Sequence, residues 1–261
     1  MRALFTAATG MSAQQTRLDT ISHNLANVNT TGFKRARAEF QDLFYETLRA
    51  PGALAANGNA LPSGVQIGNG VKLAAIGKVM TPGEMVRTGR ELDLAIEGEG
   101  FFQVERPDGE IIYTRDGTFS RDRDGNLVTA EGFQLVPNIQ IPIDAIQVTI
   151  LRDGTVSILE AGASAPSEAG QIELARFANP AGLRALGGNA FAPTEASGEP
   201  ELGNPDDEGF GSIAQGFLEN SNVNVAEELV NMILTQRAFE LNARAIQAGD
   251  EMLQTVGALY R

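Results

Sequence analysis

The segment from Ser120 to Glu131, SRDRDGNLVTAE, spaces oxygen-bearing side chains as a calcium-binding loop does. Ser120, Asp122 and Asp124 take the first, third and fifth positions, Gly125 takes the position of the sharp turn, and Glu131 takes the twelfth. However, the first ligand is serine where aspartate is usual, and the flanking segments have the composition of strands where helices are needed. A hairpin turn is therefore the favoured interpretation, and a calcium site remains the alternative.

No other group of side chains has the pattern of an active site. The single histidine, His23, has neither a nucleophile nor a second metal ligand near it in the sequence, and the chain has no cysteine. The acidic run at 206–208 lies in loop-like sequence without apolar neighbours that would raise a carboxyl pKa. The Gly-x-Gly pairs that start at Gly68 and Gly98 lack the third glycine and the helix of a phosphate-binding loop. We therefore expect no enzymatic activity and no cofactor.

The composition excludes further classes of protein. The 261 residues are 43% hydrophobic, which is enough to bury a core, and they carry a net charge of −13 that argues against a nucleic-acid partner. All of this net charge lies between residues 51 and 222. The N-terminal residues contain no apolar run of signal-peptide length, and no later stretch is apolar enough to span a membrane. We therefore expect neither a cleaved signal peptide nor membrane insertion.

Apolar residues recur every seven positions in the last segment, which predicts a helix over 225–259. Asn224 can cap its start, and Glu227 suits the positive end of the helix dipole. These 35 residues correspond to a helix of about 52 Å, longer than an ordinary globular helix. The predicted stripe, which we expect to mediate self-assembly, comprises Val225, Leu229, Met232, Ile233, Phe239, Ile246, Leu253 and Tyr260.

The first residues show the same seven-residue spacing and predict a second, shorter helix that ends near Val28. A polar cluster with a glycine, residues 29–32, follows and is typical of a helix end. The apolar stripe of this helix comprises Leu4, Met11, Leu18, Ile21, Leu25 and Val28. The shorter helix cannot cover the whole stripe of the longer one, so packing between chains is favoured over a hairpin within one chain.

The middle of the chain has strand composition. Short runs rich in branched and aromatic residues are separated by turn signals, among them four Asp-Gly pairs, which predicts a mainly antiparallel β domain. The predicted fold is α+β and multidomain, with long terminal helices that form a coiled-coil-like core. Its parts are a discontinuous helical core at 1–33 and 223–261, a joining region at 34–70 and 195–222, and an outer β domain at 71–194.

Four blocks of sequence resemble the bacterial flagellar axial proteins of the rod and hook type. They are ISHNLANVNTTGFKRARAEFQDLFYET at 21–47, LDLAIEGEGFFQV at 92–104, YTRDGTFSRDRDGNLVTAEGFQLVP at 113–137 and SNVNVAEELVNMILTQRAFELNARAI at 221–246. The length of the chain and the block at 61–71 favour a family member other than the hook subunit or the proximal rod subunit. These two subunits remain the alternatives. The signature residues are Asn24, Leu25, Ala26, Asn27, Thr31, Gly32, Phe33, Lys34, Gly98, Gly100, Phe101, Phe102, Asn222 and Val223.

The resemblance implies a structural protein. It implies concentric domains, export through the flagellar type III apparatus without cleavage, and polymerisation into an open helical homopolymer in the periplasm. The implied partners are other axial proteins of the proximal rod and hook, together with the surrounding basal-body rings. Within this family the stretch 46–70 is expected to pack against neighbouring subunits and stiffen the polymer. Two alternatives of other classes are a calcium-binding secreted β protein and an enzyme that cuts the cell wall.

Overall fold

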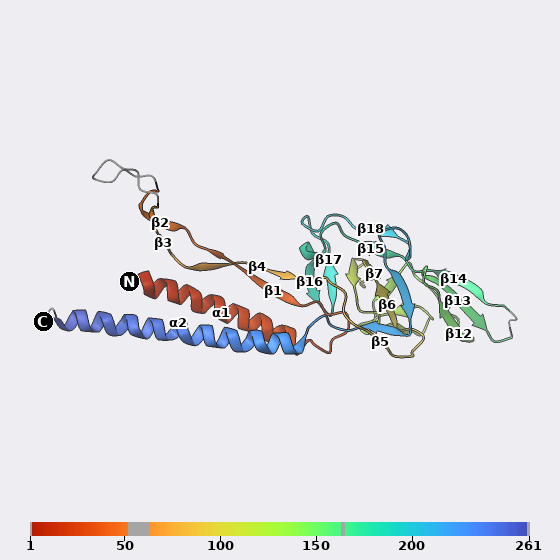
Figure 1. Ribbon diagram of the computed structural model, residues 1–261. Coiled ribbons are helices and arrows are strands. Elements are labelled where there is room, and N and C mark those ends of the chain that lie inside the picture. Colours follow the sequence, from red (N-terminus) through yellow and green to blue (C-terminus); the bar gives the residue numbers. More distant parts are fainter. Residues whose placement is uncertain (1, 52–62, 163–164, 260–261) are drawn as a thin grey trace. The chain divides into compact units, whose positions relative to one another are not determined.

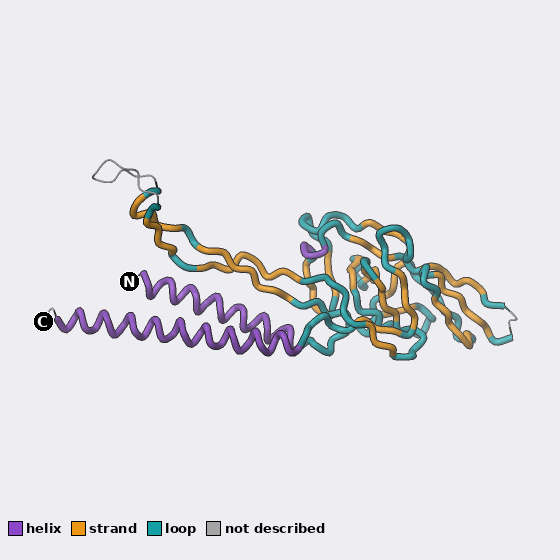
Figure 2. Tube along the Cα trace, viewed as in Figure 1, coloured by secondary structure: helices purple, strands orange, loops and turns teal. Residues whose placement is uncertain are grey.

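The computed structural model describes residues 2–51, 63–162 and 165–259, which form two compact units. The helical unit comprises Met1–Leu25, Ala36–Gly77 and Asn224–Arg261, and the strand unit comprises Ala26–Arg35 and Lys78–Val223. Figure 1 labels their elements, and Figure 2 colours them by secondary structure. The predicted α+β class, with helices at both ends and antiparallel strands between them, is confirmed.

The two helices of the helical unit are α1 (Arg2–Ala26) and α2 (Val225–Leu259). The Asn224 side-chain oxygen caps α2 by accepting hydrogen bonds from the backbone N–H groups of Ala226 and Glu227, at 3.0 and 3.3 Å. The helices contact each other along much of the length of α1, as Figure 1 shows. Neither described helix combines the length and the apolar character that crossing a membrane requires.

Small and polar residues line the face of α2 that packs against α1. Glu228, Thr235 and Gly249 are buried on this face, and Asn242 lies between the last two at the same seven-residue spacing. A Cβ built at Gly10 of α1 would lie 2.9 Å from the Asn242 side chain, and one built at Gly249 would lie 2.6 Å from Leu4. The helices therefore approach closely where one of them carries a glycine.

Replacing Gly249 by leucine should separate the two helices. The new side chain must displace that of Leu4, so relative to the same substitution at an unpacked glycine we expect a loss of roughly 1–3 kcal/mol of stability in the helical unit. The matched control is Gly257→Leu, because nothing lies within 4 Å of a Cβ at that position and leucine forms helix better than glycine. Urea unfolding followed by the helical circular dichroism signal at one protein concentration measures both. Equal midpoints for the two variants would contradict the packing described here.

A ribbon of strands completes the helical unit. The strands β1 (Ala36–Asp42) and β4 (Val71–Lys78) pair with each other, and β2 (Tyr45–Arg49) pairs antiparallel with β3 (Val65–Gly68). Where the sequence predicts a joining region at 34–70, the structure thus has strands on both sides of the undescribed residues 52–62. The many Gly, Asn and Pro residues of this stretch are typical of a linker, so the alternating apolar residues beside its turns are not recognised as strands from the sequence. The Tyr45 end of β2 and the Gly68 end of β3 are held in register opposite each other.

The strand unit is built around β7 (Phe101–Glu105), which pairs antiparallel with β8, β11 and β15. Its nine-stranded sheet has the order β16-β17-β8-β7-β11-β10-β9, with β15 and β18 off this path. A second sheet has the order β12-β13-β14, and β6 pairs with β19 and β5 with β20. The remaining strands are β5 (Met85–Arg87), β6 (Leu94–Glu97), β8 (Ile111–Thr114), β9 (Ser120–Arg121), β10 (Leu127–Val128), β11 (Gln134–Val136), β12 (Ala145–Ile150), β13 (Thr155–Glu160), β14 (Ser167–Gln171), β15 (Leu174–Arg176), β16 (Arg184–Gly187), β17 (Ala190–Ala192), β18 (Glu201–Gly203), β19 (Ser212–Gln215) and β20 (Phe217–Glu219), with a 3₁₀ turn at Pro180–Gly182.

Both faces of β7 are buried, which explains its nearly continuous apolar sequence. Phe102 belongs to the main core cluster and meets the ring of Phe119 edge-on, with the ring centroids 5.2 Å apart. Phe101, on the opposite face, belongs to a second cluster with Phe177 and Phe191. The predicted joining region at 195–222 contains β18, β19 and β20, which pair with strands of this same unit.

Of the predicted Asp-Gly hairpins, the pair at 116–117 has a different role. Asp116 accepts hydrogen bonds from the backbone and the hydroxyl of Thr118, and Gly117 does not adopt a positive φ. A Cβ at Gly117 would collide with the backbone carbonyl of Leu94. Glycine is therefore required here for a close approach between two segments, because no side chain fits. The sequence pair alone does not distinguish this role from a turn.

Candidate assembly surface and chain junction

The predicted stripe of α2 is largely exposed. Val225, Leu229, Ile233, Phe239 and Leu253 are all exposed, with Ile233 reaching 57%, whereas Met232 and Ile246 are half-buried. Tyr260 lies outside the described residues. Further exposed apolar residues on the described part of α2 fall outside the predicted stripe: Val230, Leu234, Leu241 and Met252.

The stripe of α1 is used within the chain instead. Ile21 is buried, and Leu4, Met11, Leu18, Leu25 and Val28 are half-buried. A groove between the helices, lined by residues such as Leu18 of α1 and Phe239 of α2, remains open at the surface. Of the two helices, α2 therefore leaves more of its apolar surface uncovered.

The ribbon adds to this uncovered surface. Phe44, between β1 and β2, is 92% exposed, and Tyr45, Leu48, Leu73 and Ile76 are exposed as well. Large apolar side chains are unusual at such exposure in a protein that acts alone, although single cases are common. Here they follow one two-stranded ribbon and one helix, which is typical of a surface that another protein covers.

The signature residue Asn24 holds the start of β1 inside the helical unit. Its amide group donates to the Ala36 carbonyl and its oxygen accepts from the Ala36 N–H, both at 2.8 Å. The same amide donates to a carboxylate oxygen of Glu228 on α2 at 3.2 Å. Asn24 is 1% exposed and Glu228 is 4% exposed. One buried side chain thus joins α1, α2 and β1.

Asn222 has the equivalent role in the strand unit. Its oxygen accepts from the Arg35 N–H at 2.7 Å, and its amide group donates to the carbonyls of Val79 and Thr81 at 2.8 and 3.0 Å. The Val79 N–H in turn donates to the Arg35 carbonyl at 2.9 Å. These contacts tie together three segments at the points where the chain enters and leaves the strand unit.

A buried ionic cluster lies beside Asn222. Glu219 accepts hydrogen bonds from the Lys34 ammonium at 2.5 Å, from the Gly83 N–H at 2.8 Å and from the Arg115 guanidinium at 3.4 Å. All three charged side chains are at most 4% exposed. Burial lowers the pKa of Lys34, although the charge of Glu219 acts in the opposite direction, and burial likewise lowers the pKa of Arg115.

The remaining signature residues lie in the same region or in the core of the strand unit. The Phe33 ring is buried and lies 4.5 Å from the Lys78 ammonium, and the Thr31 carbonyl accepts from Asn189. Gly98 and Gly100 adopt positive φ angles on either side of the turn into β7. The Asn27 side chain accepts a hydrogen bond from the Thr30 hydroxyl. Of the other signature residues, Gly32 and Val223 are buried, Leu25 is half-buried and Ala26 is exposed.

The candidate calcium loop forms a hairpin. Hydrogen bonds from within this hairpin engage the carboxylate of its first aspartate, Asp122. The Asp122 carboxylate accepts a hydrogen bond from the Asn126 side-chain amide, which is the main cause of its lowered pKa, and further hydrogen bonds from the N–H groups of Asn126 and Asp124 act in the same direction. Glu131 lies beyond the hairpin and lines a separate cavity of about 170 Å³. Across the described residues, no set of three or more acidic or histidine side chains is arranged to hold a metal ion. The calcium loop pattern therefore corresponds to a turn.

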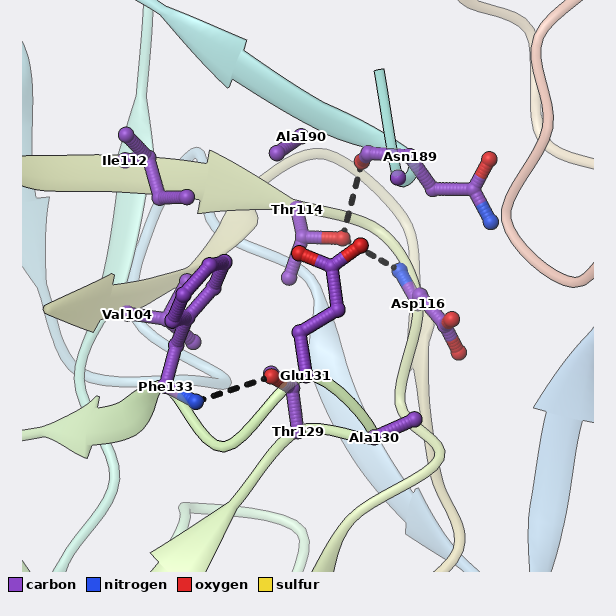
Figure 3. A pocket seen from close by; sticks show the side chains of 11 residues that line it. Val104, Ile112, Thr114, Asp116, Thr129, Ala130, Glu131, Phe133, Asn189 and Ala190 are labelled. Carbon is purple, nitrogen blue, oxygen red and sulfur yellow. Dashed lines mark hydrogen bonds between the residues drawn. The ribbon is translucent and has the colours of Figure 1, made fainter. Parts of the chain in front are cut away.

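Figure 3 shows that this cavity has polar and apolar sides. Thr114 donates its hydroxyl proton to the Asn189 carbonyl at 2.9 Å and accepts from the Asp116 N–H at 3.0 Å. Phe133 and Val104 form the apolar side (Figure 3). The Glu131 carboxylate lies near the threonine hydroxyl in the same cavity (Figure 3), but the hydroxyl donates its proton to the Asn189 backbone carbonyl.

Family models match the chain in three places. The model described as "Flagella basal body rod protein" matches residues 4–34, which include most of α1. The model described as "Flagellar hook protein FlgE/F/G D1 domain" matches residues 95–158 in the strand unit. The model described as "Flagellar basal body rod FlgEFG protein C-terminal" matches residues 214–259, which include α2.

Full-length relatives are similar over nearly the whole chain. The chain is 49% identical to the "Flagellar basal-body rod protein FlgG" of Borreliella burgdorferi, covering 100% of this chain and 99% of that protein. It is 48% identical to the protein of the same name in Agrobacterium fabrum, with 98% of each chain covered. For the protein of that name in Bacillus subtilis the identity is 39%, with 100% of each chain covered.

Proposed function

The chain belongs to the flagellar basal-body rod protein family, and we propose that this structural rod subunit of the flagellum polymerises into the distal rod. The polymer is a hollow helical drive shaft that transmits torque from the motor to the hook. Its subunits contact one another, the proximal rod, the hook and the surrounding rings. The FlgG relatives favour the distal rod over a hook or proximal rod subunit.

The observation that carries the proposal is the exposed apolar face of α2. A large apolar side chain contributes roughly 1.5–3 kcal/mol when it becomes fully buried, and α2 exposes several of them. A second copy of the chain supplies a matching surface, because every copy carries the same helix and ribbon. If this contact joins two different patches and its rotation does not close a ring, its repetition gives an open helical polymer.

Folding of the terminal helices is coupled to this assembly. In a free subunit α2 is stabilised by burial only on the face that packs against α1, because its apolar face is uncovered, and a helix of low intrinsic stability depends on packing. Neighbouring copies provide that packing in the polymer. The subunit is exported through the flagellar type III apparatus without cleavage, and partly unfolded ends are compatible with passage through its narrow channel. The subunit then assembles in the periplasm.

The strand unit forms the outer part of the rod, next to the rings. The net negative charge of the chain lies in the middle of the sequence, and charged surfaces adhere weakly to their surroundings. A rotating shaft requires weak adhesion at its outer surface. The proposed role is therefore mechanical, and the described residues contain no group of three or more acidic or histidine side chains arranged to hold a metal ion.

The purified full-length chain tests this function directly. We expect straight tubes in electron micrographs above a threshold protein concentration, together with a rise in light scattering and helical signal at the same threshold. Antibody labelling of isolated basal bodies should then mark the rod segment nearest the hook. A chain that stays compact and monomeric at every concentration, with both ends protected from amide exchange, would refute the proposal, and label at the proximal rod or the hook would favour those alternatives.

Deleting residues 46–65 should change the stiffness of the polymer more than its formation. The deletion removes most of β2 and the undescribed residues 52–62, and with them the exposed Leu48. We expect export to continue and the tubes to become curved or more flexible, because fewer contacts then connect neighbouring subunits. Persistence length measured from micrographs checks this. Tubes as straight as those of the unmodified chain would show that the ribbon does not stiffen the rod.

A further inference from the structure

The segment from Gly216 to Val223, here named the strap, joins the strand unit to the start of α2. It crosses the strand unit as β20, which pairs with β5 through Phe217↔Arg87, Leu218↔Val86 and Glu219↔Met85. The Gly216 N–H donates to the Asp93 carbonyl at 2.8 Å, and the Asn220 N–H donates to the Glu84 carbonyl at 2.9 Å. The strap is therefore held along its length by backbone contacts to one short strand and its flanks.

Apolar packing holds the strap mainly at its last residue, Val223, which is buried, and contributes little along β20. None of the strap residues, all of which the structure describes, belongs to either buried apolar cluster of the strand unit, and Phe217 and Leu218 are only half-buried. Ile213, which precedes the strap, is the last residue of the chain in the main cluster. The two apolar clusters of the strand unit therefore contain no residue of the strap.

The principal buried anchor of the strap is a carboxylate. Glu219 is 1% exposed and lies between two buried cations, Lys34 and Arg115, that come from segments 185 and 104 residues away in the sequence. The Glu219 backbone carbonyl also accepts from the Gly32 N–H at 2.8 Å. Removing one member of such a buried cluster is costly because it leaves the other charges without a partner.

The strap has a hinge at its first residue. Gly216 adopts a φ of +76°, which favours glycine, and its carbonyl accepts hydrogen bonds from the Thr88 and Gly89 N–H groups. The nearest atoms to a Cβ at Gly216 lie 3.9 Å away, so this position is not tightly packed. A change of backbone angles here moves everything that follows while β19 stays paired with β6.

We propose that the strap is a releasable clasp, closed by the insertion of Glu219 between Lys34 and Arg115, which opens while the core sheet of the strand unit stays folded. Opening frees the contacts that Glu219 and Asn222 make to Gly32, Phe33 and Arg35. It thereby allows the first turn of α2 to change direction without unfolding the strand unit. This use of the clasp during polymerisation depends on the proposed function, but the opening itself is a property of the single subunit.

The unmodified full-length chain provides the first test, by amide exchange of the monomer at increasing low concentrations of denaturant. We expect the N–H groups of Gly32, Thr88 and Asn220, whose acceptors lie in or beside the strap, to exchange through a local opening. Their exchange should be at least about tenfold faster than that of the amides in β7 and β11 and less dependent on denaturant. Coincident exchange of the two groups under all conditions would overturn the proposal.

The second test is the substitution Glu219→Gln. The glutamine side chain keeps the shape but leaves two buried cations without a counter-charge, so exchange of the strap amides should accelerate on the order of 100-fold or more, while β7 and β11 change little. The matched control is Glu201→Gln, because Glu201 is 62% exposed and pairs with Arg176 at the surface. Equal acceleration in the strap and the sheet, or no acceleration, would overturn the clasp. Both readouts concern the monomer, so a failure to polymerise leaves them unaffected.

Discussion

A chain in which Leu234 and Leu241 are both replaced by glutamate is expected to remain monomeric where the unmodified chain polymerises. The two leucines lie seven residues apart on α2 and are 61% and 64% exposed, so the substitutions remove little packing within the subunit. In the polymer each leucine would lose roughly 1.5–3 kcal/mol of burial, and the new carboxylates would have to be dehydrated. The threshold concentration should therefore rise by at least about 100-fold.

The control for this variant introduces the same charge on the same helix. Gln247 and Gln254 are exposed, polar and also seven residues apart, and both are replaced by glutamate. We expect the threshold of the control to change by less than about tenfold, because no apolar burial is lost. Sedimentation and electron microscopy at a series of concentrations measure the threshold. If the leucine variant polymerises at the same concentration as the unmodified chain, the face of α2 around Leu234 and Leu241 is not an assembly contact.

Replacing Asn24 by aspartate is expected to give the largest loss of stability in the helical unit. The carboxylate cannot donate to the Ala36 carbonyl, and it would lie beside the buried Glu228 carboxylate. An uncompensated buried charge costs roughly 3–5 kcal/mol, which is comparable to the whole stability of many domains. Urea unfolding of the helical signal at a fixed protein concentration measures the loss.

A second substitution separates the effect of charge from that of shape. In the double variant Asn24→Asp with Glu228→Gln, the glutamine amide can donate to the new carboxylate and the repulsion disappears. We expect the double variant to regain a substantial part of the lost stability, whereas Asn24→Ala should be intermediate because it leaves the Ala36 N–H without its partner. A double variant no more stable than Asn24→Asp would mean that Glu228 does not act on residue 24.

The terminal helices and the class of the fold can be predicted from the amino-acid sequence. The seven-residue spacing and the Asn224 cap predict a helix over 225–259, and α2 has these bounds. Helical periodicity, capping and turn chemistry act within a few residues, so they can be recognised from the sequence of a single segment. The strand composition of the middle segment can be recognised for the same reason. The predicted joining region at 34–70 instead contains paired strands, which its glycines and asparagines made hard to predict.

The face of α2 that packs within the chain became evident only from the folded structure. Periodicity identifies the apolar stripe that contains Val225 and Phe239, but α1 packs against the small and polar positions that include Thr235 and Gly249. Helix packing depends on the close approach of two backbones, and that depends on glycines in both helices at once. The predicted stripe is therefore left largely exposed within the subunit, which the pattern of one helix does not establish.

The roles of the charged and polar signature residues likewise depend on contacts between distant segments. Lys34 belongs to a small basic cluster in the sequence and could be a solvated surface residue, yet it is 1% exposed because Glu219 reaches it from 185 residues away. Ser120, Asp122, Asp124 and Glu131 have the spacing of a calcium loop, yet strand pairing turns the loop into a hairpin and places Glu131 in a separate cavity. Pairings of this kind depend on the whole chain, so spacing along the sequence does not encode them.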